Sequence, residues 1–289
     1  MQPLELYIHI PFCVKKCAYC DFLSGPAGEK EKEEYVKMLV DEIRNCPDTV
    51  QNYRVISIFF GGGTPSLLTG EQIGRLMDTV REIFTLDEDA EITMEMNPGT
   101  VTEEKLRKYR QAGVNRLSIG LQSVNDEELR LLGRIHTYEE FREAYHLARA
   151  NGFSNINVDL ISAIPGQTVE SWRRTLEQVM ALSPEHISAY SLILEEGTTF
   201  YKKYVEDEAK EGPKLPDEDA ERQMYWDTET LMEKNGYHRY EISNYAKEGY
   251  ACRHNLGYWE RIPYLGFGIG AASLVPGDLI GNAGSWKEK

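Results

Sequence analysis

The chain has 289 residues, enough for one large α/β domain with a smaller appendage, and its net charge of −15 argues against a nucleic-acid-binding surface. No apolar run reaches the length of a membrane span, and the start of the chain lacks the basic and apolar regions of a signal peptide. The cysteines are odd in number and clustered, which suits a reducing cytoplasm. We therefore expect a cytoplasmic protein, with peripheral association at a membrane left open.

Predicted strands and helices alternate along the chain. Apolar runs with β-branched residues predict strands at Leu4–Ile10, Val55–Phe60, Ala90–Met96, Arg116–Gly120, Ile156–Ile161 and His186–Leu192. Helical periodicity and capping residues predict helices near Lys30–Asn45, from Thr69 to about Phe84, from Thr100 to Gly113, from Thr137 to Gly152 and over Thr168–Leu182. Such alternation indicates βαβ units on a parallel sheet, with right-handed connections. Six units favour an open, partial (β/α)6 barrel over a closed eight-fold one.

The rest of the chain is expected to form a smaller appendage. We assign residues 1–195 to the barrel and residues 196–289 to an acidic crossover and a C-terminal α+β extension. Glu195–Pro216 is acidic and carries glycine and proline, so it predicts a mobile crossover. A helix is expected over Asp217–Asn235, with a proline before it and a glycine after it. Beyond Tyr264 the chain is rich in glycine and short of periodic pattern.

Three of the five cysteines fall within eight residues, with the spacing C-x3-C-x2-C. Cys13, Cys17 and Cys20 can cap three corners of a [4Fe–4S] cube and leave its fourth iron without a protein ligand. An open metal position is what a catalytic site needs. A structural zinc site would want a fourth Cys or His, but Asp21 follows the loop and His9 lies before it in a predicted strand. The spacing favours the cluster and leaves zinc as the alternative.

This spacing resembles the signature of the radical S-adenosylmethionine (SAM) superfamily. In that superfamily the open iron binds the amino and carboxylate groups of SAM, and one electron cleaves SAM to methionine and a 5′-deoxyadenosyl radical. The cofactors carry that chemistry and the protein positions them. Lys15 and Lys16 lie in the cysteine loop of an otherwise acidic protein. We therefore expect them to help dock an acidic electron donor such as a flavodoxin or ferredoxin.

Polar residues gather at the carboxyl ends of the predicted strands, the edge that carries the active site in barrel-like α/β folds. They are Gly61-Gly62-Gly63-Thr64-Pro65, Glu95 with Asn97, Gln122, Asp159, and Tyr190 with Ser191. A glycine run is often only a flexible turn, but beside an iron–sulfur loop its backbone can bind the amino-acid end of SAM. Glu95 is either an outward strand residue or an acceptor for an amine or ribose. Asp159 lies in an apolar run and needs a partner, either Arg134 or ribose hydroxyls.

Together these motifs resemble the oxygen-independent coproporphyrinogen III oxidase family over nearly the whole chain. They run in the same order and comprise Tyr7–Cys13, the glycine run, Glu95 with Asn97-Pro98, Ile119–Ser123, Gly133-Arg134, Asp159–Ile161 and Pro165–Thr168. By this resemblance, the cluster-bound SAM would contact Tyr7, Gly62, Glu95 and Thr64. A second SAM, or the wall of its pocket, would involve Gly63, Thr64, Gln122, Arg134 and Asp159.

Two departures and one further motif point to a single branch of that family, the haem chaperones called HemW. The oxidases have a further cysteine where this chain has Phe22, and an N-terminal extension before the first strand, which begins here at about Leu4. His254–Trp259, with the pattern H-N-x-x-Y-W, resembles a segment of the HemW branch. Members of that branch bind haem, pass it to haem proteins of the respiratory chain, and are not regarded as coproporphyrinogen oxidases.

The chemistry of the H-N-x-x-Y-W segment fits haem. Imidazole is the commonest axial ligand to haem iron, so His254 is the candidate ligand and Cys252 is an alternative thiolate. Tyr258 and Trp259 could stack on the flat macrocycle. The alternatives are plain packing of a loop histidine among aromatic residues, or a role at the SAM site.

We therefore expect a haem chaperone of the radical SAM family that binds haem, a [4Fe–4S] cluster and SAM, and delivers haem to acceptor haem proteins. The alternatives are an oxygen-independent coproporphyrinogen III oxidase, acting by radical oxidative decarboxylation, or another radical SAM enzyme. The resemblance also implies a further C-terminal domain of about a hundred residues. Because this sequence stops before it, we expect either a truncated or a naturally short member.

Overall fold

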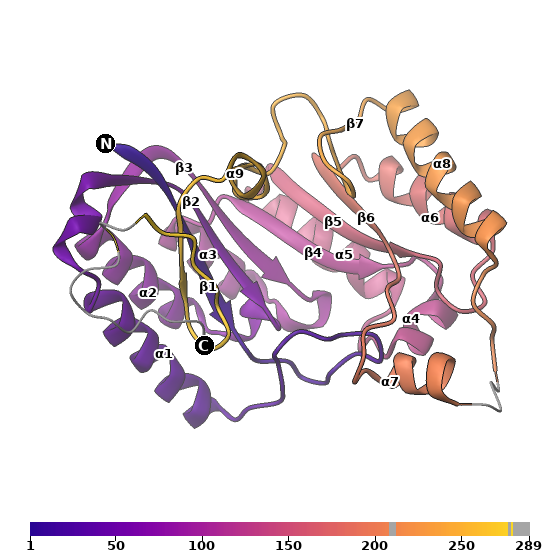
Figure 1. Ribbon diagram of the computed structural model, residues 1–289, viewed down its shortest axis with the longest axis horizontal. Coiled ribbons are helices and arrows are strands. Elements are labelled where there is room, and N and C mark those ends of the chain that lie inside the picture. Colours follow the sequence, from indigo (N-terminus) through magenta and orange to yellow (C-terminus); the bar gives the residue numbers. More distant parts are fainter. Residues whose placement is uncertain (208–211, 277–278, 280–289) are drawn as a thin grey trace.

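One open sheet organises the molecule (Figure 1). The computed structural model describes residues 1–207, 212–276 and 279, and within them a nine-stranded sheet has the order β7-β8-β6-β5-β4-β3-β2-β1-β9. The strands are β1 (Gln2–Ile10), β2 (Tyr53–Gly62), β3 (Thr85–Met96), β4 (Arg116–Gln122), β5 (Asn155–Ser162), β6 (His186–Ser191), β7 (His238–Arg239), β8 (Asn244–Ala246) and β9 (Tyr264–Phe267). Strands β1 to β6 and β9 run parallel, whereas β8 and β7 form an antiparallel edge beyond β6. Among the described strands no pairing joins β7 to β9, so the expected open α/β barrel is confirmed.

Helices connect the strands. They are α1 (Glu29–Arg44), α2 (Gly70–Ile83), α3 (Glu103–Ala112), α4 (Asp126–Leu132), α5 (Tyr138–Ala150), α6 (Val169–Ala181), α7 (Thr199–Tyr201), α8 (Glu218–Lys234) and α9 (Arg253–Glu260). Short turns of other helix types are η1 (Asp48–Asn52), η2 (Pro65–Leu67), η3 (Pro98–Thr100) and η4 (Lys202–Glu206). In Figure 1, α3 and α5 lie behind the sheet and α9 lies in front of it. In the described part of the chain, no helix is both long and apolar enough to cross a membrane.

The helix ends follow the capping residues of the sequence. The Thr69 hydroxyl accepts the N–H of Gln72, and the Gln72 side chain accepts the N–H of Thr69, so α2 begins in the expected capping box. Gly113 ends α3 with φ at 106°, a conformation that glycine adopts at least cost. Asp217 caps the start of α8, which confirms that helix.

The two faces of the sheet differ in polarity. On the helix-covered face, side chains such as Leu6, Ile8 and Ile58 are fully buried in the main core. Alternate strand positions point to the other face, which we call the inner face, because side chains alternate along a strand. Inner-face positions include Glu5, Tyr7, His9, Ser57, Phe59, Glu91, Thr93, Glu95, Arg116, Ser118, Asn157, Asp159, His186, Ser188 and Tyr190. Polar groups at such depth need partners, so this face is where ligands and covering segments belong.

The segment after β6 returns to the same sheet. β8 pairs with β6, and β9 pairs with β1 at the opposite edge. Leu265 and Phe267 of β9 belong to the main core, and α9 packs over the inner face beside β2. The sequence did not predict β9, because four residues between glycine-rich segments are too few for a periodic pattern.

The crossover after β6 begins with helical turns that the sequence did not predict. Thr198 caps α7, which continues into the π-helical turn η4, and Phe200 is buried. The sequence did not predict these helical turns, because the polar composition of the crossover concealed one anchoring aromatic side chain; the mobility of the crossover stays a prediction. Residues 208–211 of the crossover, and 277–278 and 280–289 of the glycine-rich tail, lie outside the described residues.

Candidate functional site

The cysteine loop follows β1 at the carboxyl edge of the sheet. Cys13, Cys17 and Cys20 are all half-buried free thiols. The N–H of Cys13 donates to the Gly25 carbonyl at 2.9 Å, and its Sγ lies 3.5 Å from the hydroxyl of Thr64. The first cysteine is therefore fixed against the glycine run that follows β2.

The second half of the loop lies against the segment after α4. The N–H of Ala18 donates to the Leu132 carbonyl at 2.9 Å. Arg134 places Nη1 3.8 Å from the Sγ of Cys17, and its Nη2 donates to the Gly120 carbonyl at 2.6 Å. The structure thus brings the guanidinium of Arg134 to the cysteine loop, against the Sγ of Cys17.

The glycine run makes close contacts that side chains would prevent. Gly62 has φ at 112°, and a Cβ there would lie 2.5 Å from the His9 ring. A Cβ on Gly63 would lie 2.6 Å from the Phe12 carbonyl oxygen, while the Gly63 N–H donates to the Ile10 carbonyl. Glycine is required at both positions because the run packs directly against the start of the cysteine loop.

Two carboxylates lie on the inner face near this edge. Glu95 accepts the N–H of Gly62 at 3.0 Å. Burial, and next the charge of Asp159, raise the pKa of Glu95 to about 8. Burial also raises the pKa of Asp159, which accepts hydrogen bonds from Ser118 at 2.9 Å and Asn157 at 2.8 Å. Asp159 is therefore partnered by strand side chains rather than by Arg134.

The donor set fits an iron–sulfur cluster better than a single zinc ion. The loop offers three thiols, whereas a tetrahedral structural zinc site requires a fourth ligand. A cubane instead offers a separate iron to each thiolate. The Oδ1 of Asn97 and the Nε of Arg134 are buried near this edge without a hydrogen-bond partner in the described part of the chain. Such atoms are available to a ligand.

Gln122 and Tyr7 complete the predicted set. Gln122 ends β4 with φ at 75°, where the pairing with β5 shifts register. A side chain held there is strained, and such positions cluster at functional sites. The Tyr7 hydroxyl lies 3.2 Å from His9 Nδ1, and His9 Nε2 lies 2.9 Å from the Leu23 carbonyl, so Tyr7 is tied to the cysteine loop.

Comparisons with known proteins test the family resemblance. A family model described as "Radical SAM superfamily" matches residues 7–179. "Heme chaperone HemW" of Escherichia coli (strain K12) is 44% identical over 276 residues, which are 95% of this chain and 71% of that protein. "Heme chaperone HemW" of Bacillus subtilis (strain 168) is 39% identical over 282 residues, covering 97% of this chain and 73% of that protein. The chain belongs to the HemW family of the radical SAM superfamily.

A solved structure supports the fold. It is described as "Coproporphyrinogen III oxidase (HemN) from Escherichia coli is a Radical SAM enzyme", and it matches with a TM-score of 0.82 at 29% identity. The match covers 95% of this chain and 65% of that one, so the chain spans less than two thirds of the oxidase. The resemblances drawn from the sequence motifs are confirmed, and membership of the superfamily implies a [4Fe–4S] cluster and SAM.

The HemW-type segment packs against β1 and β2, where the His254 ring stacks on Tyr7 at 6.4 Å. His254, in the first turn of α9, is only 2% exposed, and its ring stacks on Phe59 at 5.2 Å. Its Nδ1 lies 2.8 Å from the Ser57 hydroxyl, and its Nε2 lies 3.1 Å from the Tyr258 hydroxyl. Burial, and next the charge of Arg116, lower the pKa of His254 to about 3. In this conformation both ring nitrogens are occupied, so neither is free for iron.

α9 closes part of the inner face through a buried polar network. Ser57 donates to Glu5 at 3.0 Å, and a Cβ on Gly257 would lie 2.2 Å from the Glu5 carboxylate. The Cys252 thiol donates to Glu91 at 3.3 Å. Sequence reasoning missed Glu5 and Glu91. The available signal was their position on the same strand face as Tyr7 and Glu95, respectively.

Glu5→Gln should stabilise this HemW-family chain at pH 8. Burial raises the folded pKa of Glu5 from 4.5 to about 8, so folding retains a proton that the unfolded chain releases between these values. The contribution of Glu5 to the free energy of unfolding is fully present below pH 4.5, and it is lost as the pH rises towards 8. Because one pKa unit corresponds to about 1.4 kcal/mol, glutamine should add about 2 kcal/mol or more at pH 8 and little at pH 4.

Urea unfolding at several pH values measures this effect. The exposed Glu88→Gln change removes the same charge and serves as the control. An unchanged pH profile in Glu5→Gln would contradict a neutral, buried Glu5.

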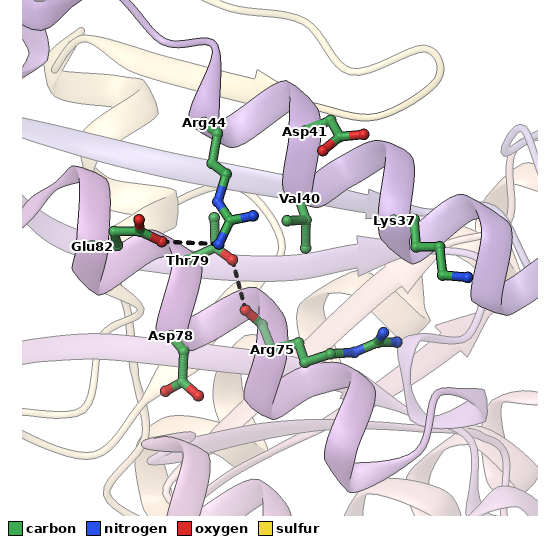
Figure 2. A pocket seen from close by; sticks show the side chains of 8 residues that line it. All are labelled: Lys37, Val40, Asp41, Arg44, Arg75, Asp78, Thr79 and Glu82. Carbon is green, nitrogen blue, oxygen red and sulfur yellow. Dashed lines mark hydrogen bonds and ion pairs between the residues drawn. The ribbon is translucent and has the colours of Figure 1, made fainter.

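A surface groove of about 500 Å³ lies elsewhere, between α1 and α2 (Figure 2). It is lined by Lys37, Val40, Asp41, Arg44, Arg75, Asp78, Thr79 and Glu82. Arg44 donates to Glu82 at 3.1 Å, and Thr79 donates to the carbonyl of Arg75 at 2.9 Å. None of the predicted site residues lines this groove, so it is separate from the chemistry of the family.

Proposed function

We propose that this chain acts as a haem chaperone that also carries a [4Fe–4S] cluster and SAM. The observation that carries the proposal is the 44% identity to a protein named as a haem chaperone, over 95% of this chain. The half-buried thiols beside the glycine run support the cluster as part of the same function. Haem would then pass to acceptor haem proteins.

In this proposal, Cys13, Cys17 and Cys20 hold the cluster. When bound, the cluster supplies a single electron to SAM. Glu95 would accept a hydrogen bond from the amino or ribose groups of SAM, since its carboxylate is already oriented by the Gly62 N–H. Tyr7, Gly63 and Thr64 would line the same space, and Gln122, Arg134 and Asp159 would line a second SAM site.

Haem coordination by His254 would require α9 to leave the inner face. The ring nitrogens are held by Ser57 and Tyr258. The alternative ligand Cys252 is fully buried, and burial raises its pKa to about 12. Both ligands therefore lie on the covered side of α9, whereas Trp259 is 59% exposed. We propose that haem first contacts the exposed side of α9 at Trp259. The helix then leaves the inner face, which frees His254 or Cys252 to bind the iron.

The second candidate is oxygen-independent coproporphyrinogen III oxidation, favoured by the similarity to the solved oxidase. Phe22, which is 66% exposed, stands where the oxidase family has its fourth cysteine. The test is to offer the reconstituted protein haem and coproporphyrinogen III in parallel. We expect haem binding without conversion to protoporphyrinogen IX, because radical chemistry loses much of its rate when the substrate is slightly misplaced. Robust, SAM-dependent product would favour the oxidase.

An acidic electron donor would dock at the cysteine loop. Lys15 and Lys16 are exposed there, on a chain whose net charge is −15. Replacing both with glutamate should slow cluster reduction by flavodoxin about tenfold at low salt, and the difference should shrink as salt screens the charges. Lys30→Glu plus Lys37→Glu changes the same charge on exposed positions of α1 and is the control. Equal rates for the two double variants would exclude this docking site.

A further inference from the structure

The cysteine loop is held by two unrelated parts of the structure. Its first half is fixed by neighbours in sequence and by the glycine run: Cys13 bonds to Gly25 and approaches Thr64. Its second half contacts a segment more than 170 residues later in the chain, because the Phe200 N–H donates to the Ala18 carbonyl at 2.9 Å. The geometry of the three thiols therefore depends on two independent supports.

Ala18 lies between the second and third cysteines, and both its backbone N–H and its carbonyl group are hydrogen-bonded. Its N–H donates to the Leu132 carbonyl at the end of α4, and its carbonyl accepts from Phe200 in α7, both at 2.9 Å. These two bonds fix the backbone that joins Cys17 to Cys20. Neither bond reaches Cys13.

A small hydrophobic cluster, separate from the main core, supports this contact. Phe200 is 2% exposed and packs with Leu132, Ile161 and Ile164. Ala18 and Tyr19 of the cysteine loop pack against the same cluster. The C-x-x-C half of the loop is therefore attached to the carboxyl end of β5 through the aromatic ring of Phe200.

Thr198 holds the helical turn that presents Phe200. Its hydroxyl accepts the N–H of Tyr201 at 3.1 Å and donates to the Glu195 carbonyl at 2.7 Å. The side chain is only 6% exposed. A buried cap of this kind gives the turn a defined start.

We propose that residues 198–204, which we call the clamp, position Cys17 and Cys20 relative to Cys13 and thereby control how tightly the three thiolates retain the cluster. The proposal rests on the proposed cluster site, but the clamp acts on the protein before any metal binds. Preorganised ligands retain a metal better because less ordering is needed on binding. Phe200 and Thr198 are positioning residues, because Phe200 contacts the loop at Ala18 and Thr198 holds the turn that presents Phe200.

The first test uses the metal-free full chain, with the rate of alkylation at each cysteine measured by mass spectrometry. Phe200→Ala should raise the rates at Cys17 and Cys20 at least about fivefold and leave Cys13 within about twofold, because only one half of the loop is released. Thr198→Val keeps the shape of the side chain, removes both hydrogen bonds of the hydroxyl, and should give the same pattern with a smaller effect. Equal acceleration at all three cysteines would overturn the proposal.

Phe153→Ala is the matched control for a lost buried ring. Phe153 is 1% exposed and precedes β5, whereas Phe200 packs at the other end of that strand. The control should lower the melting temperature without selective exposure of Cys17 and Cys20. If Phe153→Ala exposed these two thiols as strongly as Phe200→Ala, the effect would be general destabilisation and the clamp would be refuted.

The second test follows iron loss from the reconstituted protein to a chelator without oxygen. Phe200→Ala should lose iron about tenfold faster than wild type, and Phe200→Leu, which refills most of the space, should recover most of the retention. Iron loss at the wild-type rate despite selective thiol exposure would refute the link to retention. Failure of the wild type to take up iron would instead count against the proposed cluster, since the alkylation pattern does not depend on metal.

Discussion

Replacing Cys13, Cys17 and Cys20 together with alanine should abolish the broad brown absorbance that anaerobic cluster assembly gives to the wild type. The three thiols are the only clustered cysteines of the sequence, and each would bind one iron. Only Cys46 and Cys252 would remain as cysteines in the sequence, and two separate thiols do not replace three clustered ones, so iron and sulfide per chain should fall to background. Absorbance and metal analysis after anaerobic reconstitution measure the effect.

Cys46→Ala provides the control for a lost thiol. Cys46 is half-buried and packs against the main core, away from the loop. The control should keep the absorbance. About one zinc per chain in the wild type, with no iron uptake, would contradict the cluster assignment and support the alternative of a zinc site.

His254→Ala should weaken or reshape the Soret band of bound haem and leave the signal of the reduced iron–sulfur cluster intact. The two effects separate because the sites use different ligands. The change removes a ring that stacks on Phe59 and bonds to Ser57, so some loss of stability is expected as well. Haem titration followed by absorbance, together with electron paramagnetic resonance of the cluster, checks both halves.

Ser57→Ala distinguishes ligand loss from loosening of α9. This change breaks the bond to His254 but retains the imidazole, so haem should bind faster with the wild-type Soret position. Haem binding that is indifferent to both His254→Ala and Cys252→Ala would remove the two ligands named here, and another residue of the chain would have to hold the iron.

Local sequence determined most of the barrel. The capping box at Thr69 and the glycine at Gly113 set helix ends through bonds made within one turn, so no distant residue was needed to find them. The spacing of the three cysteines is likewise a local property that indicates cluster chemistry wherever the loop lies. The buried strand Val55–Phe60 was recognisable because both of its faces are covered.

The arrangement of the site depended on contacts between distant segments. The predicted choice for Asp159 was Arg134 or a ribose. The fold gives it Ser118 of the neighbouring strand β4 and Asn157, two residues earlier on β5, because all three side chains point to one face of the sheet. The sequence made His254 a candidate haem ligand because imidazole is a common axial ligand, and it left plain packing among aromatic residues as an alternative. The burial of His254 follows from the seating of α9 on Glu5 and Ser57, more than 190 residues earlier in the chain.

The sequence by itself therefore determined the α/β class, the order of strands β1 to β6, the cysteine loop and the family, since these depend on periodicity, caps and spacing along the chain. Only the tertiary structure decided that α9 closes the inner face and that Phe200 clamps the cysteine loop. The physical reason is that both contacts join single residues across long stretches of chain, where composition carries no signal and only the path of the backbone brings the partners together.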